Sequence, residues 1–270
     1  MNHLINNLQT PFYLYDESKL IESVERFLNI SYKNKKIFAA TMSNNNTDIL
    51  KILRKYDIGV FVNSKPHLEK VYACGFRGQE IVYTATAIKT EILKTLIEND
   101  NIINIDSVQQ LKLYGTLNPG GKVGIRLNVA EFFQGEIYDS VDNRIGINEK
   151  EFEVVNKIAE EFDITINGLH VYLGTHIVNY EYLKESIKKT IEVSKKIKDL
   201  EFIDFGGGFP VQGMNNQYFD YLGVVETIEA DFNNETGNIA FRATFPNPKR
   251  ILRHGETGNI LMPVAFKKAI

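Results

Sequence analysis

The alternation of short strand-like runs with longer helical segments is the feature that most constrains how this chain can fold. Runs rich in β-branched and aromatic residues recur, and each precedes a charged segment whose apolar residues repeat three or four apart. Strands are predicted at residues 36–40, 58–63, 80–85, 101–107, 122–128, 168–174, 201–206 and 250–256. Helices are predicted at residues 48–56, 66–73, 90–99, 150–162, 180–198 and 217–232. This pattern predicts an α/β fold, a closed (β/α)8 barrel of about 250 residues.

The first part of the chain does not fit this repeat. Residues 10–27 are predicted as a strand followed by a helix that leads into the first barrel strand. No sequence repeat or Pro/Ser-rich linker marks a boundary further on. We therefore expect residues 1–27 to be a lead-in and residues 28–259 to form one barrel domain. Reactive side chains in such barrels lie at the carboxyl ends of the strands, so those ends are where a site is expected.

Charge and cysteine usage narrow the classes of partner. The 270 residues carry 31 basic and 34 acidic side chains, a net charge of −3, with no basic arm, so nucleic acid is not a predicted partner. The single cysteine, Cys74, rules out an intramolecular disulfide and is predicted to be a small buried apolar residue. No signal-peptide pattern and no apolar run near the ~20 residues of a membrane span are present. We expect a cytoplasmic protein with no membrane partner.

A glycine run closes the predicted strand at residues 201–206. The segment IDFGGGFP takes an apolar strand straight into Gly206, Gly207 and Gly208. Glycines allow the backbone to approach a phosphate closely and to point successive N–H groups at it. A tight turn that only closes a barrel strand has the same sequence, so both interpretations stay open.

The segment GLHVYLGTH, residues 168–176, ends the preceding predicted strand. Alternation places His170 and Tyr172 on one face, where the Tyr172 ring can stack on a flat heteroaromatic ligand and Thr175 can donate a hydroxyl to a phosphate. The alternative is that His170 is a hydrogen-bonded interior histidine and Tyr172 is part of the core. His170 and His176 lack the spacing and the Cys or carboxylate neighbours of a zinc site, so no metal is predicted.

The segment GETGN, residues 255–259, follows the last predicted strand. A carboxylate at a strand end that faces a pyridine nitrogen keeps that nitrogen protonated, and this makes the ring an effective electron sink. Glu256 is the candidate for that role. A solvated loop glutamate is the alternative.

Together these segments resemble the ornithine, diaminopimelate and arginine decarboxylases, which share the alanine-racemase-like barrel. TPFYLYD resembles the family's opening strand, GLHVYLGTH its His-x-His-x-Gly-Ser-Gln segment, IDFGGGFP its Asp-Leu-Gly-Gly-Gly-Phe-Pro loop and GETGN its Glu-Pro-Gly-Arg segment. NIINIDSVQQL resembles the strand that ends in Asp-Ser, and NRIGI, with Arg144 and Gly146, the Arg-Phe-Gly-Ile turn. The matches keep the family's order over nearly the whole chain.

The resemblance implies a lyase of amino-acid metabolism that uses pyridoxal 5′-phosphate and acts on a small, basic amino acid. It implies that Glu256 is catalytic. It also implies a set of cofactor-binding residues, namely Tyr172, Thr175, Gly206, Gly207, Gly208 and Gly258, with His170 and Arg144 as accessory residues.

One departure from the family pattern concerns the covalent chemistry. The family's first barrel strand reads Tyr-Ala-Val-Lys-Ala-Asn, and its lysine forms an imine with the cofactor, whereas Thr41 stands at that position here. A hydroxyl cannot form an imine. Lys36 lies near the opposite end of the predicted strand, and Lys65 follows the second strand with no predicted direction.

Further departures weaken the expected hold on the cofactor. Thr257 replaces the proline and Asn259 the phosphate-binding arginine of the Glu-Pro-Gly-Arg segment, while Tyr172 replaces a stacking histidine and His67 a glutamate. Residues 260–270 are expected to be only the stub of the family's C-terminal β-domain, whose Cys-x-x-x-Asp segment completes the partner subunit's site. We therefore expect any bound cofactor to be held weakly and without a covalent bond.

Three interpretations remain open at this stage. The chain is an amino-acid decarboxylase, a non-catalytic pseudoenzyme that binds or regulates, or a truncated gene product. A pseudoenzyme that mimics a decarboxylase subunit would form a homodimer or a heterodimer with a full-length decarboxylase. Thr41 and the missing β-domain argue against turnover.

Overall fold

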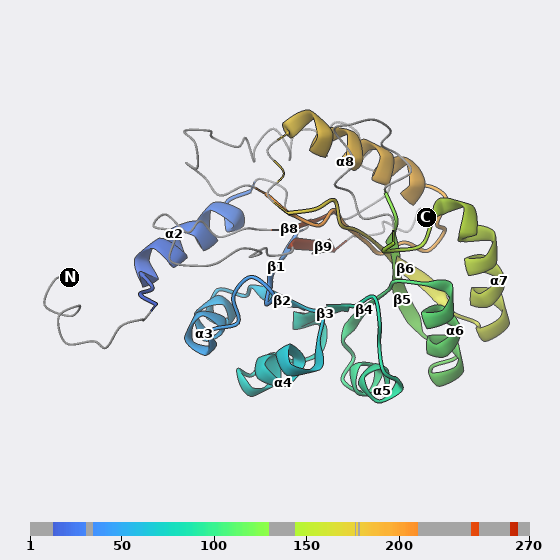
Figure 1. Cartoon of the computed structure of the whole chain (residues 1–270), viewed down its shortest axis with the longest axis horizontal. Helices are drawn as coiled ribbons and strands as arrows, with labels where there is room; N and C mark the ends of the chain where they lie inside the picture. Colours follow the sequence, from blue (N-terminus) through green and yellow to red (C-terminus); the bar gives the residue numbers. More distant parts are fainter. Residues whose placement is uncertain are drawn as a thin grey trace, which may run out of the picture.

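The computed structural model describes residues 13–30, 35–129, 144–175, 177 and 179–209, together with the backbone of residues 239–242 and 260–263. Over this part of the chain, strands alternate with helices, and the strands form one curved layer with helices outside it (Figure 1).

Parallel strands form the centre of the molecule. The strands β1 to β7 pair with one another in chain order, and β8 pairs in parallel with both β7 and β1. A further strand, β9, runs antiparallel to β1 and β7. The strand bounds are β1 (Lys36–Ala40), β2 (Gly59–Val62), β3 (Ile81–Thr84), β4 (Ile102–Ile105), β5 (Lys122–Leu127), β6 (Thr165–Val171), β7 (Phe202–Asp204), β8 (Ile239–Arg242) and β9 (Ile260–Pro263). These pairings confirm the predicted α/β barrel.

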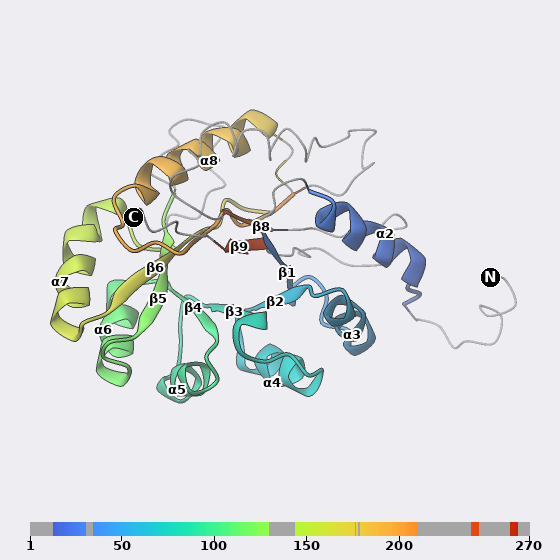
Figure 2. The ribbon, with the colours of Figure 1, turned by 180° about the vertical axis from the view of Figure 1, so that it is seen from behind.

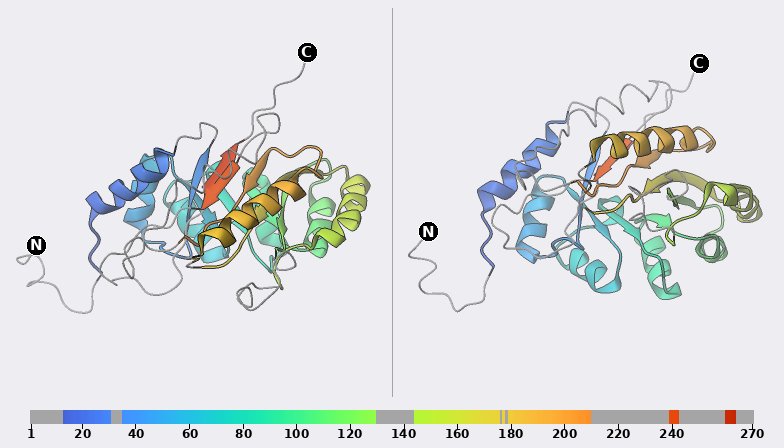
Figure 3. Two further views of the ribbon diagram at one scale, coloured as in Figure 1. Left: turned by 90° about the horizontal axis from the view of Figure 1, so that it is seen from above. Right: turned by 45° about the horizontal axis from the view of Figure 1, so that its top comes forward.

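Helices follow the strands and surround them. Seen from behind, α3 to α7 succeed one another around the outside of the strand layer (Figure 2), and α8 lies on the opposite side of that layer from α4 (Figure 3). The helices are α2 (Glu17–Leu28), α3 (Thr47–Lys55), α4 (Lys65–Ala73), α5 (Thr90–Glu98), α6 (Val108–Leu117), α7 (Phe152–Phe162) and α8 (Tyr180–Ser194). Side-chain N-caps start several of them, as where Asn46 accepts hydrogen bonds from the first turn of α3.

Several predicted boundaries differ from the structure. The strand predicted at residues 168–174 begins earlier, at Thr165, because Thr165 and Ile166 pair with Lys122 and Val123 before a register shift. Residues 13–16 of the strand predicted at the start of the chain are irregular, and the helix after them is α2. The helix at 217–232 and the strand at 250–256 lie outside the described residues. The strand that joins β7 to β1 is instead Ile239–Arg242.

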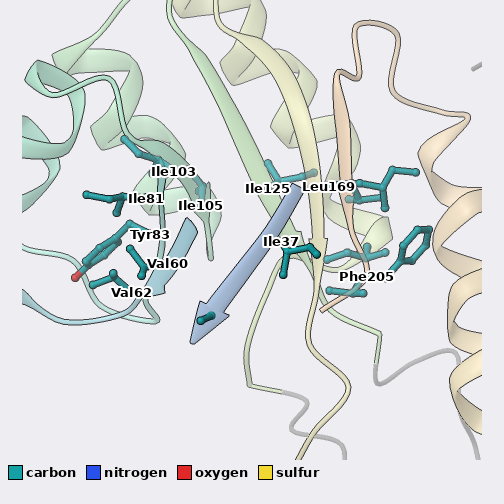
Figure 4. Packing of buried hydrophobic residues seen from close by; sticks show 14 of the residues in the cluster. Ile37, Val60, Val62, Ile81, Tyr83, Ile103, Ile105, Ile125, Leu169 and Phe205 are labelled. Carbon is teal, nitrogen blue, oxygen red and sulfur yellow. The ribbon is translucent and has the colours of Figure 1, made fainter. Parts of the chain in front are cut away.

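Alternation along the strands creates two apolar layers. One set of side chains, which includes Ile37 and Val60, packs between the strands and the helices (Figure 4). The other set faces into the barrel and consists of Phe38, Ala40, Phe61, Val82 and Phe202. The prediction for Cys74 is confirmed, since it is a buried free cysteine, and burial raises the pKa of its thiol.

Two glycines give the inner layer its shape. A Cβ on Gly168 would lie 2.0 Å from Cζ of the Phe202 ring, and a Cβ on Gly124 would lie 2.2 Å from Oδ1 of Asn104. Glycine at these strand positions therefore leaves room for Phe202 and Asn104 to fill the barrel. The next side chains along β5, β6 and β7 are Arg126, His170 and Asp204, which pair in register toward the carboxyl ends. The apolar side chains inside the barrel thus lie beneath a layer of polar side chains near the expected site.

None of the described helices is both long enough and apolar enough to cross a membrane.

Candidate binding site at the carboxyl ends of the strands

The glycine loop leaves the end of β7 and lies directly against the end of β6. Gly206 has φ +69° and Gly208 has φ +77°, a backbone conformation that L side chains rarely adopt. A Cβ at Gly206 would lie 2.4 Å from the carbonyl oxygen of Val171, and one at Gly208 would lie 2.1 Å from that of Gly174. Only glycine fits this path. The loop thus has the conformation and the bare backbone that a phosphate cradle requires.

Asp204 ties this loop to the barrel interior. Its Oδ2 lies 2.8 Å from Nδ1 of His170, and its Oδ1 accepts a 2.8 Å hydrogen bond from the N–H of Gly206. Both side chains are fully buried. The ring of Phe61, on β2, lies 5.3 Å from the His170 ring by centroids, so His170 points into the barrel. His170 is therefore an interior residue that supports the glycine loop through Asp204.

Tyr172 and Thr175 follow the end of β6 beside the loop. The Tyr172 hydroxyl and the Thr175 hydroxyl lie 3.0 Å apart, and the Tyr172 ring is half-buried. The guanidinium carbon of Arg126 lies 5.3 Å from the centroid of that ring, which is a cation–π contact. The structure thus places Tyr172 and Thr175 beside the glycine loop, and their role as ligand-binding residues stays a prediction.

Sequence reasoning missed the ion pair of Arg126 and Asp106. Nη1 of Arg126, on β5, lies 2.9 Å from Oδ1 of Asp106, just beyond β4, and the two side chains are 11% and 2% exposed. A charge inside an apolar strand was the available signal, because buried charges require partners and mark functional sites. Asp106 belongs to the Asp-Ser segment already noted, yet no role had been attached to it.

Thr41 lies at the end of β1 and is 1% exposed. Its N–H donates to the carbonyl oxygen of Phe61 over 3.0 Å, and its Oγ1 lies 3.1 Å from the same oxygen. Oγ1 also lies 2.9 Å from Nδ1 of His67, in the first turn of α4. Burial, and then the nearby Lys70, lowers the pKa of His67 below its usual value. Thr41, at the position where the sequence resemblance predicts the family's reactive lysine, is therefore held by hydrogen bonds.

The lysines considered as substitutes lie elsewhere. The Nζ of Lys36 donates to the carbonyl of Gln79 at the opposite end of the barrel, 3.2 Å away. Lys65 is exposed at the start of α4, where its Nζ lies 3.6 Å from Oε1 of Glu69. Lys36 thus lies at the wrong end of the barrel to replace a lysine at position 41, and the Lys65 ammonium group faces Glu69 at the surface.

The remaining predicted site residues are Arg144, Glu256 and Gly258. Arg144 is exposed in a turn, and Gly146 of the same turn, with φ +86°, packs against the backbone at Asn128 beyond β5. Glu256 and Gly258 lie outside the described residues, and so do His176 and Asn259. Within the described ranges, no three His, Cys, Asp or Glu side chains are grouped as a metal site requires.

A cavity of about 620 Å³ lies at the other end of the barrel. Residues at the amino-terminal ends of several strands line it, among them Lys36, Ile102 and Lys122. Active sites of such barrels lie at the carboxyl face, so we assign the site to the glycine loop rather than to this cavity.

Comparison with known proteins identifies the family of the chain. Residues 17–245 match the family model described as pyridoxal-dependent decarboxylase, pyridoxal binding domain. The chain is 28% identical over 218 residues to diaminopimelate decarboxylase of Buchnera aphidicola subsp. Schizaphis graminum, covering 77% of this chain and 50% of the relative. It is 27% identical over 256 residues to L-glutamyl-[BtrI acyl-carrier protein] decarboxylase of Niallia circulans, covering 89% and 59%. The chain thus spans little more than half the length of these relatives.

Solved structures show the same fold. Diaminopimelate decarboxylase from Helicobacter pylori complexed with L-lysine has a TM-score of 0.77 at 16% identity, over 97% of this chain and 87% of that one. The arginine decarboxylase of Paramecium bursaria Chlorella virus has a TM-score of 0.72 at 19% identity, over 85% and 64%. The family is pyridoxal-phosphate-dependent, and its model covers most of the present sequence. The chain therefore belongs to the pyridoxal-dependent decarboxylases and carries their pyridoxal-binding domain.

Proposed function

We propose that this chain binds pyridoxal phosphate, or a related phosphorylated pyridine, without a covalent bond and does not by itself decarboxylate an amino acid. The observation that carries the proposal is the contrast between the two parts of the site. The glycine loop has the path of a phosphate cradle, whereas the buried hydroxyl of Thr41 stands where an amine is needed.

The residues at the loop fit the phosphate end of the ligand. Gly206 and Gly208 hold the left-handed backbone and leave no Cβ between the loop and the end of β6. Asp204 fixes the Gly206 N–H from within the barrel, and the exposed Thr175 hydroxyl adds a donor beside the loop. The loop is thus preorganised, which lowers the entropy lost when an anion binds.

The residues around Tyr172 fit an aromatic ligand. Its ring is half-buried and lies over the Arg126 guanidinium, which is itself held by Asp106. An aromatic ring that is fixed in this way provides a stacking surface with little further loss of conformational freedom. We propose that it carries the pyridine ring.

The residues at the end of β1 do not fit the covalent attachment of the cofactor. When bound, pyridoxal phosphate supplies an electron sink for reactions at the α-carbon of amino acids. Thr41 has no amine, and its oxygen already contacts Phe61 and His67. We therefore assign no imine-forming or proton-transferring role to Thr41.

The second candidate function is decarboxylation of a small amino acid. The similarity to diaminopimelate decarboxylases favours it, and one such enzyme has been seen with L-lysine. This function needs a reactive amine, which Thr41 does not supply. It also needs an amino-acid site, to which a full-length decarboxylase in a heterodimer would contribute.

Calorimetric titration with pyridoxal phosphate tests the proposal. We expect weak, saturable binding at one site per chain, reduced by inorganic phosphate, and no release of carbon dioxide from L-lysine or diaminopimelate. The expected weakness follows from Asn259, because loss of one bidentate charge-assisted contact removes ~1.5–3 kcal/mol. Absence of any binding heat at millimolar cofactor contradicts the proposal, as does steady decarboxylation by the isolated chain.

A further inference from the structure

A chain of side-chain hydrogen bonds joins the ends of β1 and β2 to α4. Nζ of Lys70 lies 2.9 Å from Oδ1 of Asn45, whose Nδ2 lies 2.8 Å from Nε2 of His67. Nδ1 of His67 lies 2.9 Å from Oγ1 of Thr41, and that oxygen lies 3.1 Å from the Phe61 carbonyl oxygen. Four consecutive contacts therefore connect an ammonium group to a backbone carbonyl.

The chemistry of the two ends fixes the direction of every bond. An ammonium only donates, so the amide of Asn45 must turn its oxygen toward Lys70 and its NH2 toward His67. Nε2 of His67 then has to accept, which places the single proton of the neutral ring on Nδ1. That N–H donates to Thr41, whose own proton is left to donate to the Phe61 carbonyl, because a carbonyl only accepts.

The electrostatics of His67 agree with this direction. Burial and the neighbouring Lys70 favour the neutral ring, which the chain of bonds requires. A protonated ring would place an N–H at Nε2 against the NH2 of Asn45, so two donors would face each other. In the neutral ring, each contact pairs one donor with one acceptor.

We propose that His67 is a positioning residue that, with Asn45 and Lys70, holds the Thr41 hydroxyl as a donor to the Phe61 carbonyl. Thr41 and His67 then act as one hydrogen-bonded pair. The Thr41 oxygen accepts from His67 and gives its proton to the backbone, so it acts neither as a nucleophile nor as an acid. The consequence for the ligand rests on the proposed function, whereas the hydrogen-bond chain itself does not.

Nitrogen-15 NMR of the histidine rings tests the direction without any ligand. At neutral pH, we expect His67 to carry its proton on Nδ1 and to show an unprotonated Nε2. Asn45→Asp should reverse the tautomer of the His67 ring, because a carboxylate only accepts hydrogen bonds and therefore requires a proton on Nε2. We expect the tautomer to switch in that variant. A wild-type ring protonated on Nε2, or an unchanged tautomer in Asn45→Asp, overturns the proposal.

A double-mutant cycle tests the coupling. Thr41→Val and His67→Leu each remove one partner of the hydrogen bond. We expect the unfolding equilibrium constant of the double variant to differ about fivefold from the product of the two single effects, as the typical contribution of one hydrogen bond predicts. Thr84→Val is the matched control, because Thr84 is also buried and its hydroxyl has no hydrogen-bond partner among the described residues. It should show no coupling to His67→Leu.

The outcomes separate this inference from the proposed function. Additive effects of Thr41→Val and His67→Leu, within twofold, overturn the inference even if pyridoxal phosphate binds. A tautomer and a coupling as expected uphold it even if calorimetry detects no cofactor, in which case only the proposed function fails.

Discussion

Replacement of Gly208 by alanine tests whether the close approach of the glycine loop to β6 shapes the site. Alanine at φ +77° carries a conformational strain of ~1–2 kcal/mol. The new Cβ would also lie 2.1 Å from the carbonyl oxygen of Gly174, so the loop must move. We expect that movement to lengthen or break the 2.7 Å hydrogen bond from the Ile177 N–H to the Gly208 carbonyl, which contributes ~0.5–1.5 kcal/mol to stability. We expect a total destabilisation of roughly 2–4 kcal/mol.

Gly120→Ala is the control that measures the effect of backbone strain without a steric clash of the new Cβ. Gly120 has φ +76°, nearly the same as Gly208, but a Cβ there would have nothing within 4 Å. Urea unfolding should therefore show a loss of only ~1–2 kcal/mol. In calorimetry, Gly208→Ala should bind pyridoxal phosphate at least tenfold more weakly than wild type, and Gly120→Ala should bind it normally. Equal losses of stability in both variants, with binding intact, would refute the reasoning.

Three further predictions concern residues near the strand ends. In Thr41→Lys, imine formation with pyridoxal phosphate should return, seen as a new absorption band, while decarboxylation should not; absence of the band would show that position 41 is not beside the cofactor. Arg126→Met should lower the unfolding free energy by ~3–5 kcal/mol because it leaves the Asp106 carboxylate buried without its charge partner; a loss below ~1 kcal/mol in urea would contradict this. Burial, and then the nearby Lys70, lowers the pKa of His67, so the unfolded chain takes up a proton more readily and stability should fall as the pH drops below 6.5. His67→Gln should remove that part of the pH dependence, and an unchanged profile would contradict the assignment.

The barrel was predictable because its strands are buried on both faces. Runs such as GVFV in β2 and IINI in β4 are short, apolar and bounded by turn residues, and the helices between them have a clear period. The early start of β6 was not predictable, because Thr165 and Ile166 join it through a register shift relative to β5. Such a shift depends on the neighbouring strand and not on the local sequence.

The candidate site was predictable only in part. Gly206 to Gly208 and Tyr172 could be proposed from the sequence because glycine runs and aromatic strand ends are visible in one segment. The charge of Arg126 inside the apolar strand β5 was visible in the sequence, but its partner was not, because Asp106 lies just beyond a different strand. The same holds for Thr41 and His67, which were noted as separate departures, while Asn45 was not noted at all. Contacts between distant segments require the folded structure.

Reduction with borohydride most directly tests the central claim that this barrel binds its cofactor without a covalent bond. Wild-type protein saturated with pyridoxal phosphate is reduced with and without excess inorganic phosphate, and each lysine is examined by peptide mass spectrometry. We predict that calorimetry detects binding and that no lysine adduct is suppressed by inorganic phosphate. Adducts at surface lysines should form equally with and without phosphate, because they do not depend on the glycine loop. One adduct per chain that phosphate suppresses and that maps to a single lysine, such as Lys65, would contradict the account and identify a displaced nucleophile.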